Sequence, residues 1–285
     1  ELGISNAHAG ILVITPEDVG EENAKPGTEF KKLYGLDDII VDIENKMFTH
    51  RPDCFGMLGA ARELAGIQQK KFISPEWYLR SNPPAEISKN LQLEVFNDVS
   101  GLVPRFMVCA LAGVKVSASP INIQAALSRA GIKPINNVVD VTNFVMMLTA
   151  QPLHAYDYDK LVKLSGKAEL RVRPAKDGEE LTILGGKRIK LKNGDSAISS
   201  GEIVVGLAGV MGGADTEVDE STKNIVLECG SFDMRMTRKS AMVHGLFTDA
   251  ATRFTKGQSP QQNDRAFFEA IRLLSEICQA NIASN

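Results

Sequence analysis

The sequence predicts an α+β fold: mixed or antiparallel sheets with flanking helices, preceded by a small partial α/β segment. Apolar runs typical of strands, such as LQLEVF and NIVLE, are interspersed with capped helical patterns but follow no strict βαβ repeat. Gly185-Gly186 and Asn193-Gly194 stand where tight turns between short strands require a positive φ. Asn82-Pro83-Pro84 interrupts the regular pattern and separates two parts of the chain.

The first part of the chain contains few regular elements. Residues 1–35 mix short apolar pieces with turn formers, as expected for a cut piece of a larger unit. IIVDI at 39–43 alternates with period two and predicts a half-buried strand. RPDC then leads into a predicted helix that stops at Gly66 and has one apolar face, formed by Met57, Leu58, Ala61, Leu64 and Ala65. Residues 74–90 form the predicted linker.

From residue 91 onward the signals are denser. LQLEVF and PRFMVCALAGVKV predict strands, Ser119-Pro120 begins a helix that ends at Gly131, and a second helix contains 144–148. Residues 169–205 predict short strands in a meander or two hairpins. After them we expect a strand in IVVGLAGV, a glycine pair at 212–213, a strand in NIVLE, a helix from 233 to 245 and a long helix after 260.

Composition excludes several classes of protein. With 44% hydrophobic and 24% charged residues the chain is globular, and it has neither an apolar run long enough for a membrane span nor a signal-peptide pattern. Thirty-two basic against 35 acidic residues provide no global attraction for nucleic acid, so RNA would have to bind local patches. Four separated cysteines without a CxxC pair fit a reducing cytosol, and we expect a cytoplasmic protein.

One candidate site lies in the stretch from 136 to 157. Small polar side chains, Thr142 and Asn143, precede a short apolar helix, and the loop after it carries His154. An imidazole with an ordinary pKa near 6.5 can orient a water or assist the leaving group of an ester. The alternative is a histidine hydrogen-bonded to nearby backbone. Asp157 and Asp159 beside it resemble a metal site only weakly, and no metal is expected.

Two further candidates are a glycine-rich loop and a single acid. The loop GLAGVMGG, from Gly206 to Gly213, either brings backbone amides close to a ligand or makes a tight strand turn. Glu228 follows three apolar strand residues, so it either faces solvent or lies hydrogen-bonded in a pocket. HGLFTDAATRF places Thr248 and Ala250 beside an arginine, which fits a pocket floor or a packed turn.

These motifs occur in one order that resembles the β-subunit family of bacterial phenylalanyl-tRNA synthetases over essentially the whole chain. The resemblance rests on RPDCFGMLGAAREL, INNVVDVTNFVMM, QPLHAYD, GLAGVMGGADTEV, IVLECGSFD and HGLFTDAATRFTKG. FTHRPDC and KGQSP depart from the usual family pattern, and both lie outside the expected pocket. The resemblance implies that 1–35 is the tail of an OB-like tRNA-binding insertion, 36–80 a remnant of the N-terminal domain with a linker, and 90–285 an editing domain with a C-terminal helix.

The resemblance also implies a function for the editing domain: hydrolysis of tyrosine wrongly esterified to phenylalanine-specific tRNA, by a positioned water. It implies that Glu228 reads the tyrosine hydroxyl and that His154 lies near the ester and the terminal adenosine. Thr142 and Asn143 would be polar pocket groups. The remaining implied substrate-binding positions are the backbone wall at Ala208, Gly209 and Gly212, and the gating residues Thr248 and Ala250.

The implied partners are the acceptor end of the tRNA and the α subunit, in a heterotetramer of two α and two β chains. No cofactor is expected for this segment, because ATP and magnesium would bind elsewhere in the full synthetase, and no membrane is expected. A different class of function stays open at this stage: the segment is a catalytically silent structural or tRNA-docking module. Convergence of the site residues on one cavity would favour editing, and scattered positions would favour the scaffold.

Overall fold

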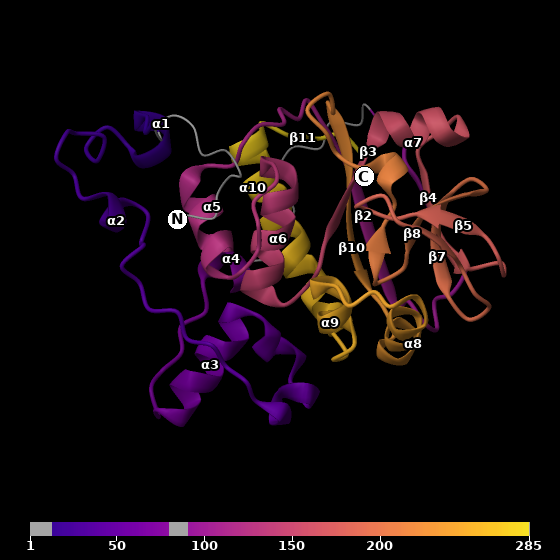
Figure 1. Ribbon diagram of the computed structural model, residues 1–285, viewed down its shortest axis with the longest axis horizontal. Coiled ribbons are helices and arrows are strands. Elements are labelled where there is room, and N and C mark those ends of the chain that lie inside the picture. Colours follow the sequence, from indigo (N-terminus) through magenta and orange to yellow (C-terminus); the bar gives the residue numbers. More distant parts are fainter. Residues whose placement is uncertain (1–12, 80–90, 285) are drawn as a thin grey trace.

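The computed structural model describes residues 13–79 and 91–284, and it confirms the α+β class. Strands gather on one side of the molecule, the long helices α6 and α10 lie beside them, and the N-terminal segment lies on the other side (Figure 1). The α-helices are α1 (Pro16–Val19), α2 (Phe30–Leu33), α3 (Met57–Ile67), α4 (Glu76–Leu79), α5 (Ile121–Arg129), α6 (Asn137–Thr149), α7 (Tyr158–Ser165), α8 (Met234–His244), α9 (Asp249–Phe254) and α10 (Asn263–Cys278). Short 3₁₀ helices are η1 (Lys46–His50), η2 (Pro52–Phe55), η3 (Ala214–Thr216) and η4 (Pro260–Gln262).

The strands form two sheets and a hairpin. One sheet has the order β1-β4-β7-β8-β9, the other has the order β11-β2-β10-β3, and β5 pairs with β6. The parallel pairing of β1 with β4 makes the first sheet mixed, whereas the second is antiparallel. The strands are β1 (Glu94–Asn97), β2 (Arg105–Ala112), β3 (His154–Asp157), β4 (Glu169–Pro174), β5 (Glu180–Thr182), β6 (Arg188–Lys190), β7 (Ser196–Ser200), β8 (Ile203–Leu207), β9 (Met211–Gly212), β10 (Asn224–Ser231) and β11 (Asn281–Ile282).

Strand β10 is covered on both faces, and this sets the direction of its side chains. Ile225, Leu227 and Cys229 belong to the core that α6 and α10 cover. Val226 belongs to the second core, which lies between the two sheets. Because side chains alternate along a strand, Glu228 is on the same side as Val226 and faces the space between the sheets.

Helix α6 is fixed at its start by side-chain hydrogen bonds. The Asn136 side chain caps the helix by accepting hydrogen bonds from two backbone N–H groups of its first turn. Asp140 is fully buried and accepts from the Ser119 hydroxyl (2.6 Å) and from the Ile135 N–H (2.8 Å). These bonds fix both the helix and the loop before it.

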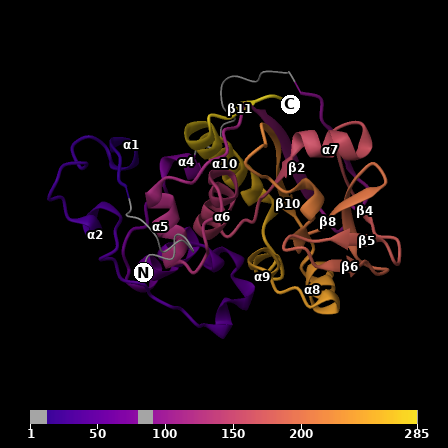
Figure 2. The same cartoon turned by 45° about the horizontal axis from the view of Figure 1, so that its top comes forward.

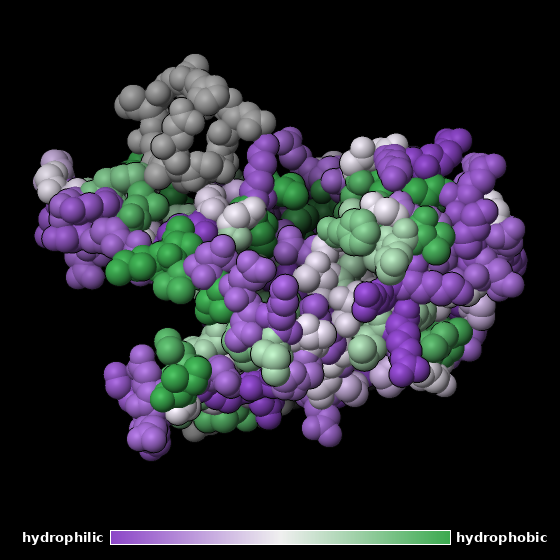
Figure 3. All heavy atoms as spheres, turned by 60° about the horizontal axis from the view of Figure 1, so that its bottom comes forward, coloured by the Kyte–Doolittle hydropathy of each residue, from purple (hydrophilic) through white to green (hydrophobic). Residues whose placement is uncertain are grey.

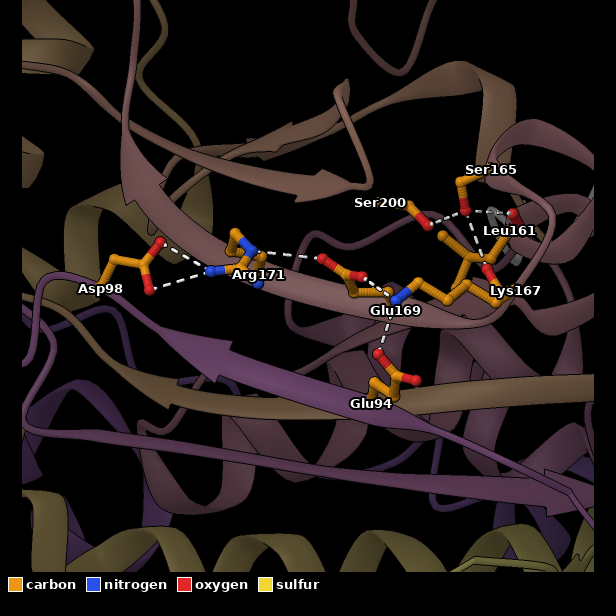
Figure 4. Close-up of polar contacts among 8 residues, drawn as sticks. All are labelled: Glu94, Asp98, Leu161, Ser165, Lys167, Glu169, Arg171 and Ser200. Atoms are coloured by element: carbon orange, nitrogen blue, oxygen red, sulfur yellow. Dashed lines mark hydrogen bonds and ion pairs between the residues drawn. The ribbon is translucent and has the colours of Figure 1, made fainter.

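Charged side chains connect the edge strand β1 to β4 (Figure 4). The Lys167 ammonium contacts the carboxylates of Glu94 (2.6 Å) and Glu169 (2.8 Å). The Arg171 guanidinium contacts Glu169 (3.2 Å) and donates two hydrogen bonds to Asp98 (3.1 and 3.0 Å). Glu169 is buried between the two cations, whereas the pairs to Glu94 and Asp98 lie at the surface, where a single ion pair contributes little stability.

The β5–β6 hairpin packs against the first sheet beside β8 (Figure 2). Leu181 and Ile189 share a third core with Leu207 of β8 and Leu246 after α8. The two glycines of the hairpin turn have φ values of 85° and 84°, which confirms the turn predicted at 185–186. The turn of the hairpin thereby reaches the cavity described below, which Leu184 and Gly185 help to line.

The strand predicted at 39–43 is wrong. Residues 39–45 have no regular secondary structure, and Ile39, Ile40 and Val41 are 83%, 66% and 71% exposed. A strand needs a second strand to which it can hydrogen-bond, and residues 13–79 contain no strand. The segment predicted as α/β therefore contains only helices among its described residues. Hydrophobic side chains are visible at the surface of this end of the molecule (Figure 3).

The predicted helix after RPDC is confirmed as α3, but its predicted apolar face is not its packing face. Met57 and Leu64 are each 54% exposed. The close approach is made by glycine instead: a Cβ on Gly56 would lie 2.3 Å from the backbone nitrogen of Ala150, after α6. The glycine therefore permits this contact between the N-terminal segment and α6.

Candidate functional site

A cavity of about 410 Å³ lies between α6, the two sheets and the start of α9. Every site residue that the sequence and the resemblance pointed to lines it, except Ala208. Ala208 is 1% exposed and belongs to the core between the sheets, one residue away from a lining position. The lining residues from the predicted set are Thr142, Asn143, His154, Gly209, Gly212, Glu228, Thr248 and Ala250.

Glu228 and His154 lie directly opposite each other in the cavity wall. β10 and β3 are antiparallel, and their register pairs Glu228 with His154. Paired residues on adjacent strands point their side chains to the same face, with Cβ atoms about 5 Å apart. The pairing therefore places a carboxyl group and an imidazole side by side on one cavity.

Glu228 is buried, with 5% of its surface exposed, so the solvent-facing alternative does not hold. Its Oε2 accepts a 2.5 Å hydrogen bond from the Tyr156 hydroxyl, while no described residue bonds to Oε1. Burial raises the pKa of Glu228 to about 7, and the bond from Tyr156 opposes that shift. Near neutrality the carboxyl group can therefore either donate or accept a hydrogen bond.

Tyr156 is a site residue that sequence reasoning missed. Its ring meets that of His154 edge to face, with centroids 4.4 Å apart and planes at 85°. Burial and the neighbouring Glu228 raise the pKa of Tyr156, so its hydroxyl stays protonated. The signal was present in QPLHAYD, because a residue two positions after His154 in a strand shares its face.

His154 is the first residue of β3, where the sequence predicted a loop. Its Nε2 is shielded from solvent and has no hydrogen-bond partner among the described residues. Burial lowers the pKa of His154 to about 4, so the ring is neutral at pH 7. A neutral imidazole nitrogen without a partner can accept a hydrogen bond from a bound water or hydroxyl group.

The glycine-rich loop makes the tight strand turn that was one of its two predicted roles, and it also lines the cavity. It makes the turn between β8 and β9, in which Gly209 has φ +72°. It also lines the cavity, and a Cβ on Gly212 would lie 2.5 Å from both Cε1 and Nε2 of His154. Only a residue without a side chain lets this backbone lie against the imidazole.

Thr142 and Asn143 lie in the middle of α6, and the helix is longer than predicted. The Thr142 hydroxyl donates to the Val139 carbonyl within the helix (2.7 Å). Asn143 is half-buried, and its side-chain amide has no bond to any other described residue. Together with Met146, these residues line the cavity with one stripe of α6.

Thr248 caps α9 and connects it to the glycine-rich loop. Its hydroxyl accepts from the Ala251 N–H (3.0 Å) and donates to the Val210 carbonyl (2.8 Å). Ala250 follows on the cavity wall and is half-buried. Small side chains at these two positions keep the wall open.

The cavity lining carries no lysine or arginine among the described residues. Its titratable side chains are His154, Tyr156, Glu217, Glu228 and Asp249. Asp249 forms an ion pair with Arg253 (2.9 Å). The described residues also hold no group of three or more His, Cys, Asp or Glu side chains suited to a metal.

The basic residues of β6 and its turn, and the aspartates after His154, do not line this cavity. Lys187, Arg188 and Lys190 are exposed, and Arg188 and Lys190 lie near Glu180. Asp157 instead caps α7 and accepts from the Thr222 hydroxyl (2.6 Å). The cavity is thus mainly apolar, with an acid and a neutral imidazole on one wall, and it can hold an aromatic ring that bears a hydroxyl group.

Comparison with known proteins shows which family the chain matches. The B3/4 domain family matches residues 102–279, more than half of the 285. The phenylalanine--tRNA ligase β subunit of Lactobacillus acidophilus is 38% identical over 99% of this chain and 34% of its own length. That of Fusobacterium nucleatum is 34% identical over 100% of this chain and 34% of its own length.

A solved N-terminal fragment of the phenylalanyl-tRNA synthetase β subunit from Pyrococcus horikoshii has a TM-score of 0.39 and 14% identity. The structural match covers 73% of this chain and 59% of that fragment.

No helix in the described ranges combines the length and apolarity that a membrane crossing requires. The chain spans about a third of the length of the curated relatives it matches. By the match to residues 102–279, it belongs to the B3/4 domain family and corresponds to a region of phenylalanine--tRNA ligase β subunits.

Proposed function

We propose that the chain is an editing hydrolase that releases tyrosine from tRNA specific for phenylalanine. The observation that carries the proposal is the pairing of Glu228 with His154 on one cavity wall. The carboxyl group would bind the phenol, and the imidazole would lie toward the ester. In the complete enzyme this segment would work beside an α subunit and bind the acceptor end of the tRNA.

The physical case for a separate tyrosine site rests on one hydroxyl group. An apolar pocket built for phenylalanine rejects a ring with an added hydroxyl by only about 10², whereas a site that hydrogen-bonds the hydroxyl rejects the ring lacking it by about 10⁴ or more. Glu228 retains Oε1 for that purpose while Oε2 is held by Tyr156. A phenylalanyl ester would leave this buried oxygen without a partner.

The proposed reaction is a direct attack by water. The water oxygen bonds to the carbonyl carbon of the ester, the bond from that carbon to the ribose oxygen breaks, and the ribose oxygen takes up the proton that the water gives up. Nε2 of His154 would accept a hydrogen bond from the attacking water and orient it. Backbone N–H groups of the glycine-rich loop would stabilise the oxyanion, and each such donor is worth about 10²–10³ in rate.

The test is deacylation by the chain of tyrosyl-tRNA and phenylalanyl-tRNA, both made on phenylalanine-specific tRNA. We expect release of tyrosine in preference to phenylalanine. No release of either amino acid, with tRNA binding retained, would instead identify a silent docking module. Release of both at equal rates would contradict the reading of the phenol by Glu228.

A further inference from the structure

We propose that Glu217 binds the α-ammonium group of the aminoacyl ester, so that the cavity accepts an esterified amino acid with a free amine and disfavours both free and N-acylated tyrosine. This inference rests on the proposed function, since it names the part of the substrate that a second acid would bind. It follows from the charges that line the cavity.

The cavity has three acidic side chains and no basic one among its described lining residues. Glu228 is buried and bonded to Tyr156, and Asp249 is paired with Arg253 at 2.9 Å. Glu217 is exposed, and no cation contacts its carboxylate among the described residues. It is therefore the acid whose charge remains for a ligand.

Hydrogen bonds hold the backbone of Glu217 at the cavity wall. The Lys160 ammonium donates to the Glu217 carbonyl oxygen (2.6 Å) and also to the Asp219 carboxylate (2.6 Å). The Glu217 N–H follows the end of η3 and donates to the carbonyl of Ala214, the first residue of η3 (3.2 Å). Lys160 is thus bound to a carbonyl and to another acid.

The charge pattern distinguishes three forms of tyrosine. An aminoacyl ester carries a cationic amine and no carboxylate, so it complements a cavity with an uncompensated acid and no cation. Free tyrosine has the same amine together with a carboxylate, for which the lining offers no basic partner. An N-acylated ester has no charge for Glu217 to bind. The cavity would therefore favour the ester and release the free acid after hydrolysis.

The first test compares tyrosyl-tRNA and N-acetyl-tyrosyl-tRNA as substrates of the full chain at pH 6.5, where an α-amino group is cationic. We expect Glu217→Gln to lower kcat/KM for the free amine roughly tenfold, mainly through KM, and to leave the acetylated substrate unchanged. Glu220→Gln is the matched control, because Glu220 is exposed nearby and does not line the cavity. An equal effect of Glu217→Gln on both substrates, or none on either, would overturn the assignment.

The second test separates this inference from the hydrolysis itself. Calorimetry of the full chain with tyrosine methyl ester, tyrosine and N-acetyl-tyrosine methyl ester measures binding without any reaction of tRNA. We expect the free-amine ester to bind most tightly, and Glu217→Gln and added salt to remove its advantage. Persistence of that advantage in the variant would refute the role of Glu217, whereas its loss would support the role even if tRNA were not deacylated.

Discussion

His154 and Gly212 show how one residue without a side chain determines the surroundings of another. The backbone of Gly212 occupies the space beside the imidazole, and Nε2 is left without a bonded partner. A buried polar atom without a partner destabilises the fold unless a ligand or water completes it. The arrangement therefore favours an imidazole kept for a bound molecule over one that supports the fold.

Replacing His154 with alanine should lower the rate of tyrosine release by about 10²-fold, because the attacking water loses the hydrogen-bond acceptor that orients it. Because the ring makes no hydrogen bond through Nε2, the circular dichroism spectrum should stay the same. His50→Ala, at an exposed position far along the chain from the cavity lining, is the control and should retain full activity. An unchanged rate in His154→Ala would remove the imidazole from the mechanism.

Gly212→Ala should reduce deacylation about 10²-fold while the chain still folds. The added Cβ would lie 2.5 Å from the His154 ring, which must then move, and a shift of about 1 Å in a reacting group has an effect of that size. Gly66→Ala is the control, since a Cβ there meets nothing within 4 Å in α3. Wild-type kinetics in Gly212→Ala would show that the imidazole position is not critical.

At the scale of elements, α6 joins the core to the cavity. Val138, Val141 and Val145 pack into the core shared with α10, while another stripe of the helix lines the cavity. The orientation of α6 therefore determines where Thr142 and Asn143 lie. Asp140 is one of the side chains that tie the start of this helix to its surroundings.

Asp140→Ala should lower the free energy of unfolding by about 1–3 kcal/mol, because it leaves the Ser119 hydroxyl and the Ile135 N–H without their acceptor. Urea denaturation followed by circular dichroism measures this change. Asp37→Ala, at an exposed position without an ion pair to another described residue, should change the unfolding free energy by less than about 0.5 kcal/mol. Equal stability of the two variants would contradict the role given to Asp140.

Over the whole molecule, the predictable elements are those specified by neighbours in sequence. Helix α8 begins after Asp233, whose side chain caps it, and ends at Gly245 with φ +63°, as predicted from those two residues. The strand at 39–43 failed because a strand depends on a partner elsewhere. Caps and stops are local, whereas strand pairing is not.

The site likewise has features that the sequence predicts and features that it does not. The glycine-rich loop could be predicted from its residues, and the family resemblance named the positions that the cavity brings together. The burial of Glu228 could not be predicted, because it requires both faces of β10 to be covered by distant segments. The bond from Tyr156 to Glu228 likewise depends on the register between β3 and β10.

Buried titratable groups should give the whole chain an uneven pH dependence of stability. The folded pKa of Glu228 is raised from 4.5 to about 7, so the folded state keeps a proton that the unfolded state loses. Its contribution to the free energy of unfolding therefore falls as pH rises from 4.5 through 7. The folded pKa of His154 is lowered from 6.5 to about 4, so its contribution falls as pH drops over that range.

Glu228→Gln isolates the first of these effects. Urea denaturation between pH 5 and 8 should show the variant gaining stability relative to the wild type as pH rises, since its amide does not ionise. Glu220→Gln should instead follow the wild-type profile, because Glu220 is exposed. Parallel profiles for wild type and Glu228→Gln would contradict the raised pKa of Glu228.

The central claim is that one carboxyl group reads a phenol while the neighbouring imidazole prepares the ester. The ratio of kcat/KM for tyrosyl-tRNA to that for phenylalanyl-tRNA, measured for wild type and for Glu228→Ala, tests it most directly. We predict a ratio of at least about 10² in the wild type and a loss of tenfold or more of that preference in the variant. An undiminished preference in Glu228→Ala would contradict the account.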